Sequence, residues 1–370
     1  MSKQFVESKH CPNNRGAFFK IAIRLAVLTG AWSLCCSAGP IALTISGMVT
    51  GSNMSGAAVG AGDYTLQQLA DAGAAVGSVN LNGLTGVPIW SLLGGNAAGS
   101  SDVVTSTPAG DNPKNAILRS YLLATNAAGQ TSIISLGEID PFFGGTGSVP
   151  VFVAFSGTDG QPELVFPGTG ASGRDVIDLA SIQVLAGPAA PMGAGGVSTS
   201  LTLTGNVANP GTYTVQSLQS LPSSTVGISG DNYTGVPILT FLNPTSTDVK
   251  NQYVLVTGTD GYETLYSLAE LDPAFGAPSD LIAYADTQGQ FPGDGFARTV
   301  IPGDNHAGRY VSNLNAIAVG SVPEPGTGTL VSVVLLILYL SRKQPGRRAL
   351  RNSLETRRQS QMSLADYDVM

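Results

Sequence analysis

The sequence predicts a mostly β chain with short helices (α+β), arranged as two tandem, similar modules between an apolar N-terminal leader and a C-terminal apolar helix. Three observations support this prediction. Segments of the first half return in the same order in the second half, apolar and polar residues alternate on both sides of a turn sequence, and helix-capping sequences precede short amphipathic stretches.

Five pairs of segments carry the internal repeat. They are LTISGMV at Leu43 with LTLTGNV at Leu201, YTLQQL at Tyr64 with YTVQSL at Tyr213, TGVPIWSLL at Thr85 with TGVPILTFL at Thr234, SLGEIDPFFG at Ser135 with SLAELDPAFG at Ser267, and FPGTGASGRDVIDLASIQV at Phe166 with IPGDNHAGRYVSNLNAIAV at Ile301. Because the matches keep their order, the sequence predicts a first module at 39–185 and a second at 200–320. The stretch between them, 186–199, is rich in Pro and Gly and is predicted to be a linker.

Local signals place the elements of the first module. Thr65 with Gln68 predicts a capping box at the start of the amphipathic stretch 66–72. The stretch 96–115 has no counterpart in the second module and is rich in turn-forming residues, which indicates an inserted loop. Ser135 with Glu138 predicts a second cap and a short helical turn.

In the second module, apolar and polar residues alternate on both sides of Asp260-Gly261, which predicts a β-hairpin over 253–268. Ser267 with Glu270 predicts a capped turn that Pro273 ends. The first module has NAAGQT at 126–131 in place of the Asp-Gly turn.

The N-terminal residues 1–38 have the pattern of a secretory signal peptide, because basic residues precede an uncharged run from Leu25 to Cys36. We expect cleavage after Ala38, with an uncleaved N-terminal helix as the alternative. The three cysteines, Cys11, Cys35 and Cys36, all precede this point. The mature chain would therefore contain no disulfide, no thiolate metal ligand and no cysteine nucleophile.

The C-terminal segment 321–343 combines an uncharged run with a basic end. Val322, Pro323, Glu324 and Pro325 precede the run 326–340, and Arg342 and Lys343 follow it. Fifteen helical residues extend about 22 Å, whereas the hydrocarbon of a bilayer is about 30 Å thick. We expect a marginal transmembrane helix with Arg342 and Lys343 as stop-transfer charges, followed by a basic, disordered tail at 344–370.

The body of the chain is acidic. Between residues 39 and 322 there are 6 Lys and Arg residues against 20 Asp and Glu residues, whereas the whole chain has a formal net charge of −7. Such a surface disfavours nucleic acid, whose binding is driven by positive charge. Calcium binding by the acidic body stays open.

One histidine lies in the body, in the stretch PGDNHAGR. Asp304, His306 and Arg309 are therefore the candidate ligand-pocket residues, although a lone loop histidine is typically a surface residue. Arg174 is the repeat equivalent of Arg309, and we expect the two to pair with Asp175, Asp304 or a backbone carbonyl within each module. We predict no catalytic, cofactor-binding or metal-ligating residue.

The stretches VLVTGTDGYETLYSLAELDPAFG and IPGDNHAGRYVSNLNAIAV resemble the later part of the molybdopterin-binding domain of the sulfite oxidase family. The resemblance covers most of 201–319 and, with fewer matching residues, 43–184. In that family a cysteine thiolate holds the metal together with the pterin. Because the predicted mature chain has no cysteine and the leader has no Arg-Arg pair, we expect a scaffold that carries no cofactor and no molybdenum.

The C-terminal segment resembles the PEP-CTERM sorting signal of Gram-negative envelopes: Val322, Pro323, Glu324 and Pro325, an apolar helix and a basic cluster. The resemblance implies processing by signal peptidase and then by an exosortase-like enzyme. The tail at 344–370 is longer than this pattern, and a permanent anchor is the alternative.

Two classes of function follow. The first is an exported, non-enzymatic protein, held transiently in the inner membrane with its body periplasmic and then placed at the cell surface or in the extracellular matrix, where polysaccharide is a candidate partner. The second is an exported small-ligand-binding or oxidoreductase-accessory protein on the molybdopterin-domain scaffold.

Overall fold

The computed structural model describes residues 39–322, apart from 50–52, 55–56, 97–102, 105–115, 145–148, 158, 169, 189–192, 278, 290 and 292. The described residues belong to one compact unit that begins at Gly39. Several predicted segments lie outside the described residues. They are the signal peptide, the sorting residues Pro323, Glu324 and Pro325, the charges Arg342 and Lys343, and the tail. None of the described helices is long and apolar enough to cross a bilayer.

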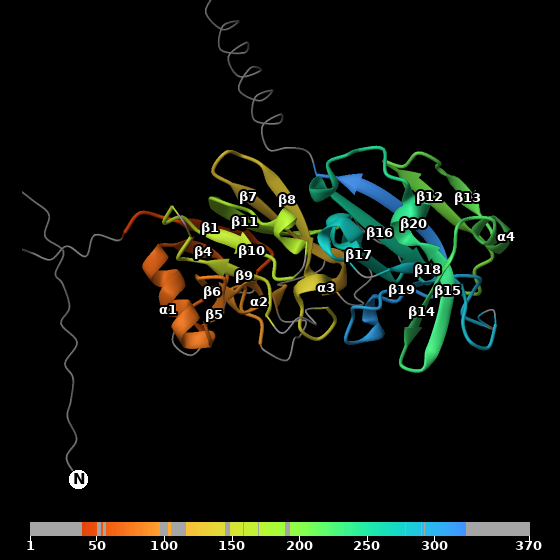
Figure 1. Ribbon diagram of the computed structural model, residues 1–370, viewed down its shortest axis with the longest axis horizontal. Helices are drawn as coiled ribbons and strands as arrows, with labels where there is room; N and C mark the ends of the chain where they lie inside the picture. Colours follow the sequence, from red (N-terminus) through yellow and green to blue (C-terminus); the bar gives the residue numbers. More distant parts are fainter. Residues whose placement is uncertain are drawn as a thin grey trace, which may run out of the picture. The chain divides into compact units, whose positions relative to one another are not determined.

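The first repeat contains two main sheets (Figure 1). One has the order β4 (Gly62–Tyr64), β1 (Leu43–Gly47), β11 (Leu179–Ala186), β7 (Ser120–Asn126) and β8 (Thr131–Ser135). The other has the order β10 (Glu163–Val165), β9 (Phe152–Ala154), β6 (Leu84–Pro88) and β5 (Val79–Leu81). A small third sheet pairs β2 (Asn53–Met54) with β3 (Ala57–Ala58).

The second repeat reproduces both main sheets in the same order. Its five-stranded sheet runs β13 (Gly211–Tyr213), β12 (Leu201–Gly205), β20 (Leu314–Ser321), β16 (Gln252–Gly258) and β17 (Glu263–Ser267). Its four-stranded sheet runs β14 (Ser224–Ile228), β15 (Asp231–Pro237), β18 (Leu281–Ala285) and β19 (Arg298–Val300). In each repeat the first and last of these strands pair in parallel, β1 with β11 and β12 with β20, and every other pair is antiparallel.

Within the described ranges the helices are few and short. The α-helices are α1 (Leu66–Val76), α2 (Ile89–Leu92), α3 (Leu136–Ile139), α4 (Val215–Gln219) and α5 (Ile238–Leu242). The 3-10 turns are η2 (Ala116–Arg119), η3 (Ala171–Arg174), η4 (Val249–Asn251), η5 (Ala269–Leu271), η6 (Pro273–Phe275) and η7 (Ala307–Arg309). This composition confirms the predicted fold class, mostly β with short helices.

The capping sequences act as predicted. Thr65 and Gln68 form a complete capping box at the start of α1, which runs four residues further than the amphipathic pattern indicated. At Ser267, the backbone N–H donates to the Glu270 carboxylate and the hydroxyl accepts from the Glu270 N–H. Pro273 does end this turn, but it also begins the next one, η6, where a proline at the first position costs no hydrogen bond.

The predicted hairpin is present as β16 and β17. Its loop is longer than a two-residue turn, because four residues separate the strands. Gly261 takes the positive φ of +78° that the Asp-Gly sequence favours, and the Asp260 carboxylate accepts from the Tyr262 N–H.

Each repeat has its own hydrophobic core, and the two repeats share a third apolar cluster. The shared cluster consists of Tyr121, Leu123 and Ile133 from β7 and β8 with Leu255 and Leu265 from β16 and β17. β8 therefore lies beside β17 (Figure 1). Burial of these side chains, at about 25 cal/mol per Å² of apolar surface, holds the five-stranded sheets together.

The described part of the predicted linker contacts the hairpin loop of the second repeat. The N–H of Gly195 donates to the Thr259 carbonyl, and the Thr259 hydroxyl donates to the Gly196 carbonyl. The N–H of Ser198 donates to the side chain of Asn313. This stretch is thus hydrogen-bonded to the second repeat, and the separation of the modules by proteolysis stays a prediction.

Candidate functional site

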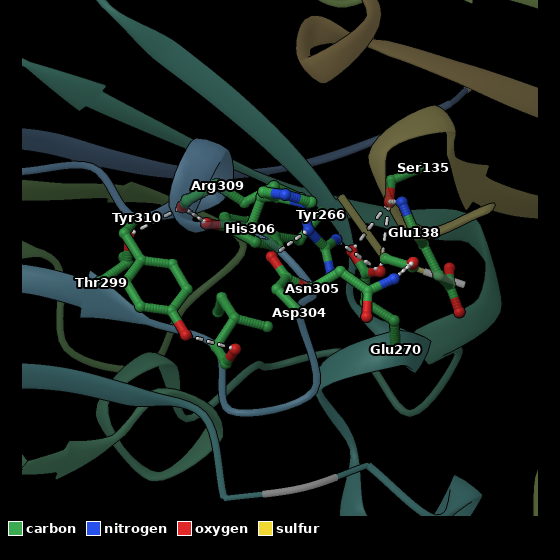
Figure 2. A network of polar contacts seen from close by, with 12 residues as sticks. Ser135, Glu138, Tyr266, Glu270, Thr299, Asp304, Asn305, His306, Arg309 and Tyr310 are labelled. Atoms are coloured by element: carbon green, nitrogen blue, oxygen red, sulfur yellow. Dashed lines mark hydrogen bonds and ion pairs between the residues drawn. The ribbon is translucent and has the colours of Figure 1, made fainter. Parts of the chain in front are cut away.

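Two buried arginines occupy equivalent positions, at the ends of η3 and η7. Arg309 donates from Nε to Asp304 Oδ2 at 2.9 Å and from one terminal nitrogen to Glu270 Oε2 at 3.0 Å. Arg174 forms a two-pronged ion pair with Glu138. We call these five residues, Glu138, Arg174, Glu270, Asp304 and Arg309, the central ion cluster. Figure 2 shows four of them, Glu138, Glu270, Asp304 and Arg309.

The central ion cluster joins the two repeats. The hydroxyl of Ser135 in the first repeat donates to the Glu270 carboxylate of the second at 3.0 Å. In the opposite direction, Arg174 of the first repeat donates to the hydroxyl of Ser267 in the second at 3.2 Å. The two capping serines therefore serve a second purpose, because each also contacts a charged residue of the other repeat. Figure 2 shows the contact of Ser135 with Glu270.

Gly137 allows the aliphatic part of the Arg309 side chain to lie close to the backbone of α3. A Cβ atom on this glycine would lie 2.8 Å from Arg309 Cδ and 2.9 Å from a Leu118 methyl group. The α3 turn can contact the second repeat closely because this position has no side chain.

Among the predicted pocket residues, Asp304 and Arg309 come together and His306 lies apart from them. The imidazole stacks on the Phe142 ring of the first repeat with ring centres 4.1 Å apart, and its Nδ1 lies 2.6 Å from the Phe142 carbonyl. His306 is exposed and does not line the cavity described below. Its contacts belong to the boundary between the repeats.

Both arginines pair within their own repeat, as expected, but the carboxylate partner of Arg174 differs from the expected one. Arg309 pairs with Asp304, as predicted. The prediction that Arg174 pairs with Asp175 is wrong, since the Asp175 carboxylate instead accepts from the Phe166 N–H at 2.7 Å. Arg174 reaches Glu138, which is distant in sequence, and lies over the Phe166 ring.

In the central ion cluster, burial and the charges of the ion-pair partners shift the pKa values in opposite directions. Burial and the nearby Glu138 charge raise the pKa of Glu270 to about 8, although Arg309 and Arg174 act against the shift. For Glu138, burial is outweighed by the charge and hydrogen bonds of Arg174, so its pKa is lowered. Burial likewise opposes the charge of Arg309, but Glu270 and Asp304 more than compensate and raise its pKa.

A cavity of about 300 Å³ adjoins the central ion cluster and is lined by both repeats. Asp280, which directly precedes β18, lies on its wall and is only 5% exposed. Among the described residues, Asp280 Oδ1 has no hydrogen-bond partner. Burial, more than the charges of Asp304 and Glu138, raises the pKa of Asp280 to about 8 against the counteracting charge of Arg309.

These pKa shifts predict stability that falls as the pH rises. When the pKa of a carboxyl group is higher in the folded state than in the unfolded state, its contribution to stability is complete at pH values below the unfolded-state pKa. This contribution falls as the pH rises from the unfolded-state pKa to the folded-state pKa. Asp280 and Glu270 therefore predict a decline between about pH 4 and pH 8, by at most about 1.4 kcal/mol per pH unit for each group.

The measurement is urea unfolding at several pH values for the wild type and for Asp280→Asn, which keeps the shape and removes the titration. The variant should show a shallower decline and higher stability at pH 8. Asp231→Asn, at an exposed position, serves as the control. Equal pH slopes for Asp280→Asn and the wild type would contradict the prediction.

The comparisons with known proteins return little. No protein-family model and no curated protein matches the chain. Among the solved structures that match, the sulfane dehydrogenase SoxCD from Paracoccus pantotrophus is similar in part, at 14% identity and a TM-score of 0.26, over 38% of this chain and 43% of that chain.

The described residues that line the cavity include no cysteine, so this donor set does not fit a molybdenum centre held through a thiolate. Within the part of the chain that the structure describes, no group of three or more His, Cys, Asp or Glu side chains is arranged to hold a metal ion. We derive no chemistry through a bound metal or pterin.

Sequence reasoning missed Asp280 as a site residue and treated Glu138 and Glu270 only as helix caps. The repeat itself holds the signal for Asp280. The Asp280 carbonyl accepts from the Ile238 N–H, and the Val151 carbonyl accepts from the Ile89 N–H in the same way. Asp280 and Val151 are thus structural equivalents, which the five aligned segments did not reach.

Proposed function

We propose that the chain is an exported protein of a Gram-negative cell envelope or extracellular matrix, with a non-catalytic structural or binding role. The observation that supports this best is the internal use of the charged groups. Each nitrogen of the Arg309 guanidinium donates to a carboxylate of its own chain. A cation paired in this way stabilises the interior of the second repeat and is not available to polarise a substrate.

The end of the body supports a sorted C-terminus. β20 ends at Ser321, and the N–H of Val322 donates to the Asn251 carbonyl at 3.3 Å. The proposed sorting residues Pro323, Glu324 and Pro325 therefore follow a residue that is attached to the fold. Prolines there would keep the chain extended and out of the apolar helix.

In this proposal signal peptidase removes 1–38, the apolar run 326–340 halts in the inner membrane with Arg342 and Lys343 in the cytoplasm, and an exosortase-like enzyme then separates the body. The acidic body suits extracellular polysaccharide better than nucleic acid as a partner. The body itself would be a tandem, cofactor-free form of the sulfite oxidase-like domain.

A second candidate is an exported small-ligand-binding or oxidoreductase-accessory protein on the same scaffold. The cavity of about 300 Å³ favours it, because this volume is at the lower end of the range for small-molecule sites. The two candidates are compatible, since a sorted envelope protein can hold a small ligand.

Export and sorting are tested with one tag in the body and another after Arg351, in a host that has the sorting enzyme. We expect the body to leave the membrane without the second tag, and intact mass to show a mature start near Gly39. Replacing Pro323 and Pro325 by alanine should abolish the release. Both tags staying together in the membrane, unchanged by these substitutions, would leave only a permanent anchor.

A further inference from the structure

The wall of the inter-repeat cavity is partly apolar and partly polar, and one of its polar residues, Asp280, makes no side-chain hydrogen bond that the structure records among the described residues. The apolar part of the wall consists of Val149, Val151, Phe166, Leu271, Phe275 and Ile301. Asp280 lines the same space, and among the described residues its Oδ1, which is itself closed off from solvent, has no hydrogen-bond partner. A buried oxygen in this state costs about 1–3 kcal/mol relative to a satisfied one.

The repeat shows that the fold itself does not require this carboxyl group. At the equivalent place in the first repeat stands Val151, which makes the same backbone hydrogen bond and lines the same cavity. An aspartate at a position where valine serves the structure equally is a destabilising choice. A ligand that donates a hydrogen bond to the carboxyl group would offset this cost.

The charges around the cavity decide the kind of ligand. Four carboxyl groups and two guanidinium groups line it. Both guanidinium groups are already neutralised, Arg309 by Asp304 and Glu270 and Arg174 by Glu138. On the described wall an anion would therefore meet only cations that are already paired. A cationic N–H group could donate a hydrogen bond to the Asp280 carboxyl group.

We propose that this cavity binds a small primary ammonium compound with a short apolar body, which donates its N–H groups to Asp280 and packs its carbon chain against the apolar wall. The proposal is independent of export and sorting, because it concerns the folded chain in solution. A failure of either proposal would leave the other standing.

Binding should depend on pH. The charged groups that act on Asp280 are Arg309, Asp304 and Glu138. A bound ammonium favours the ionised carboxylate, so binding releases a proton from Asp280 and tightens as the pH rises toward 8. Affinity should therefore be higher at pH 8 than at pH 6.

The experiment titrates the purified full-length chain with n-butylammonium chloride by isothermal calorimetry. Sodium butanoate, an anion of similar length, and 1-butanol, a neutral donor, are the matched controls. We expect saturable binding of butylammonium, weaker binding of butanol and none of butanoate. Methyl resonances of Val151 and Ile301 should shift as the site fills.

Two variants separate the role of the carboxylate from a change of fold. Asp280→Val copies the first repeat and should bind butylammonium about tenfold or more weakly, the loss of one charged hydrogen bond, with native circular dichroism. Asp280→Asn keeps the shape and should lose the pH dependence. The proposal is overturned if the wild type shows no saturable binding, if butanoate binds as tightly, or if both variants retain wild-type affinity.

Discussion

Replacing Arg309 by methionine is expected to lower the free energy of unfolding at pH 8 by about 3–5 kcal/mol. Methionine fills much of the same space but leaves Glu270 and Asp304 buried without their cation. At pH 5 the loss should be smaller, because carboxyl groups that lose a cation take up protons more readily. Urea unfolding at both pH values measures the difference.

Two further variants are compared with Arg309→Met, one as a control and one that should restore part of the stability. Arg298→Met removes a guanidinium that lies 5.7 Å from the Phe291 ring centre and, among the described residues, makes no ion pair, so it should cost no more than about 1 kcal/mol. Adding Glu270→Gln to Arg309→Met should recover part of the lost stability. If Arg309→Met costs no more than Arg298→Met, the central ion cluster does not stabilise the fold as we infer.

The second large effect is expected for Gly205→Ala, at the end of β12. Gly205 has a φ of +89°, and a Cβ there would lie 2.0 Å from the Val319 carbonyl oxygen in β20. A side chain cannot be accommodated at such a distance without separating the two strands. Because the parallel pairing of β12 with β20 joins the start of the second repeat to its end, we expect a loss of more than about 4 kcal/mol.

Gly230→Ala is the matched control for this substitution. Gly230 also has a positive φ, +96°, but no neighbouring atom lies within 4 Å of its would-be Cβ. It should cost only the backbone strain, about 1–2 kcal/mol. Circular dichroism and thermal unfolding compare the two variants, and similar melting temperatures would show that the clash with β20 is not the main cause of the destabilisation.

The sequence by itself determined the elements that depend on short-range contacts. The capping boxes at Thr65 and Ser267 and the hairpin around Asp260 were predictable because the interacting residues lie within a few positions of each other. Repetition of the same local signals then indicated that each half of the chain builds the same sheets, and the strand orders agree with that indication.

The candidate site depended on contacts that only the tertiary structure could decide. Arg174 could have paired with its neighbour Asp175, but the backbone turn directs that carboxylate to the Phe166 N–H. Glu138 is 36 residues away and becomes the partner because both groups are buried together, where an unpaired charge is costly. Asp280 was likewise recognised only from the folded repeats, because the burial of its carboxyl group and the cavity that it lines with Val151 depend on residues distant in sequence.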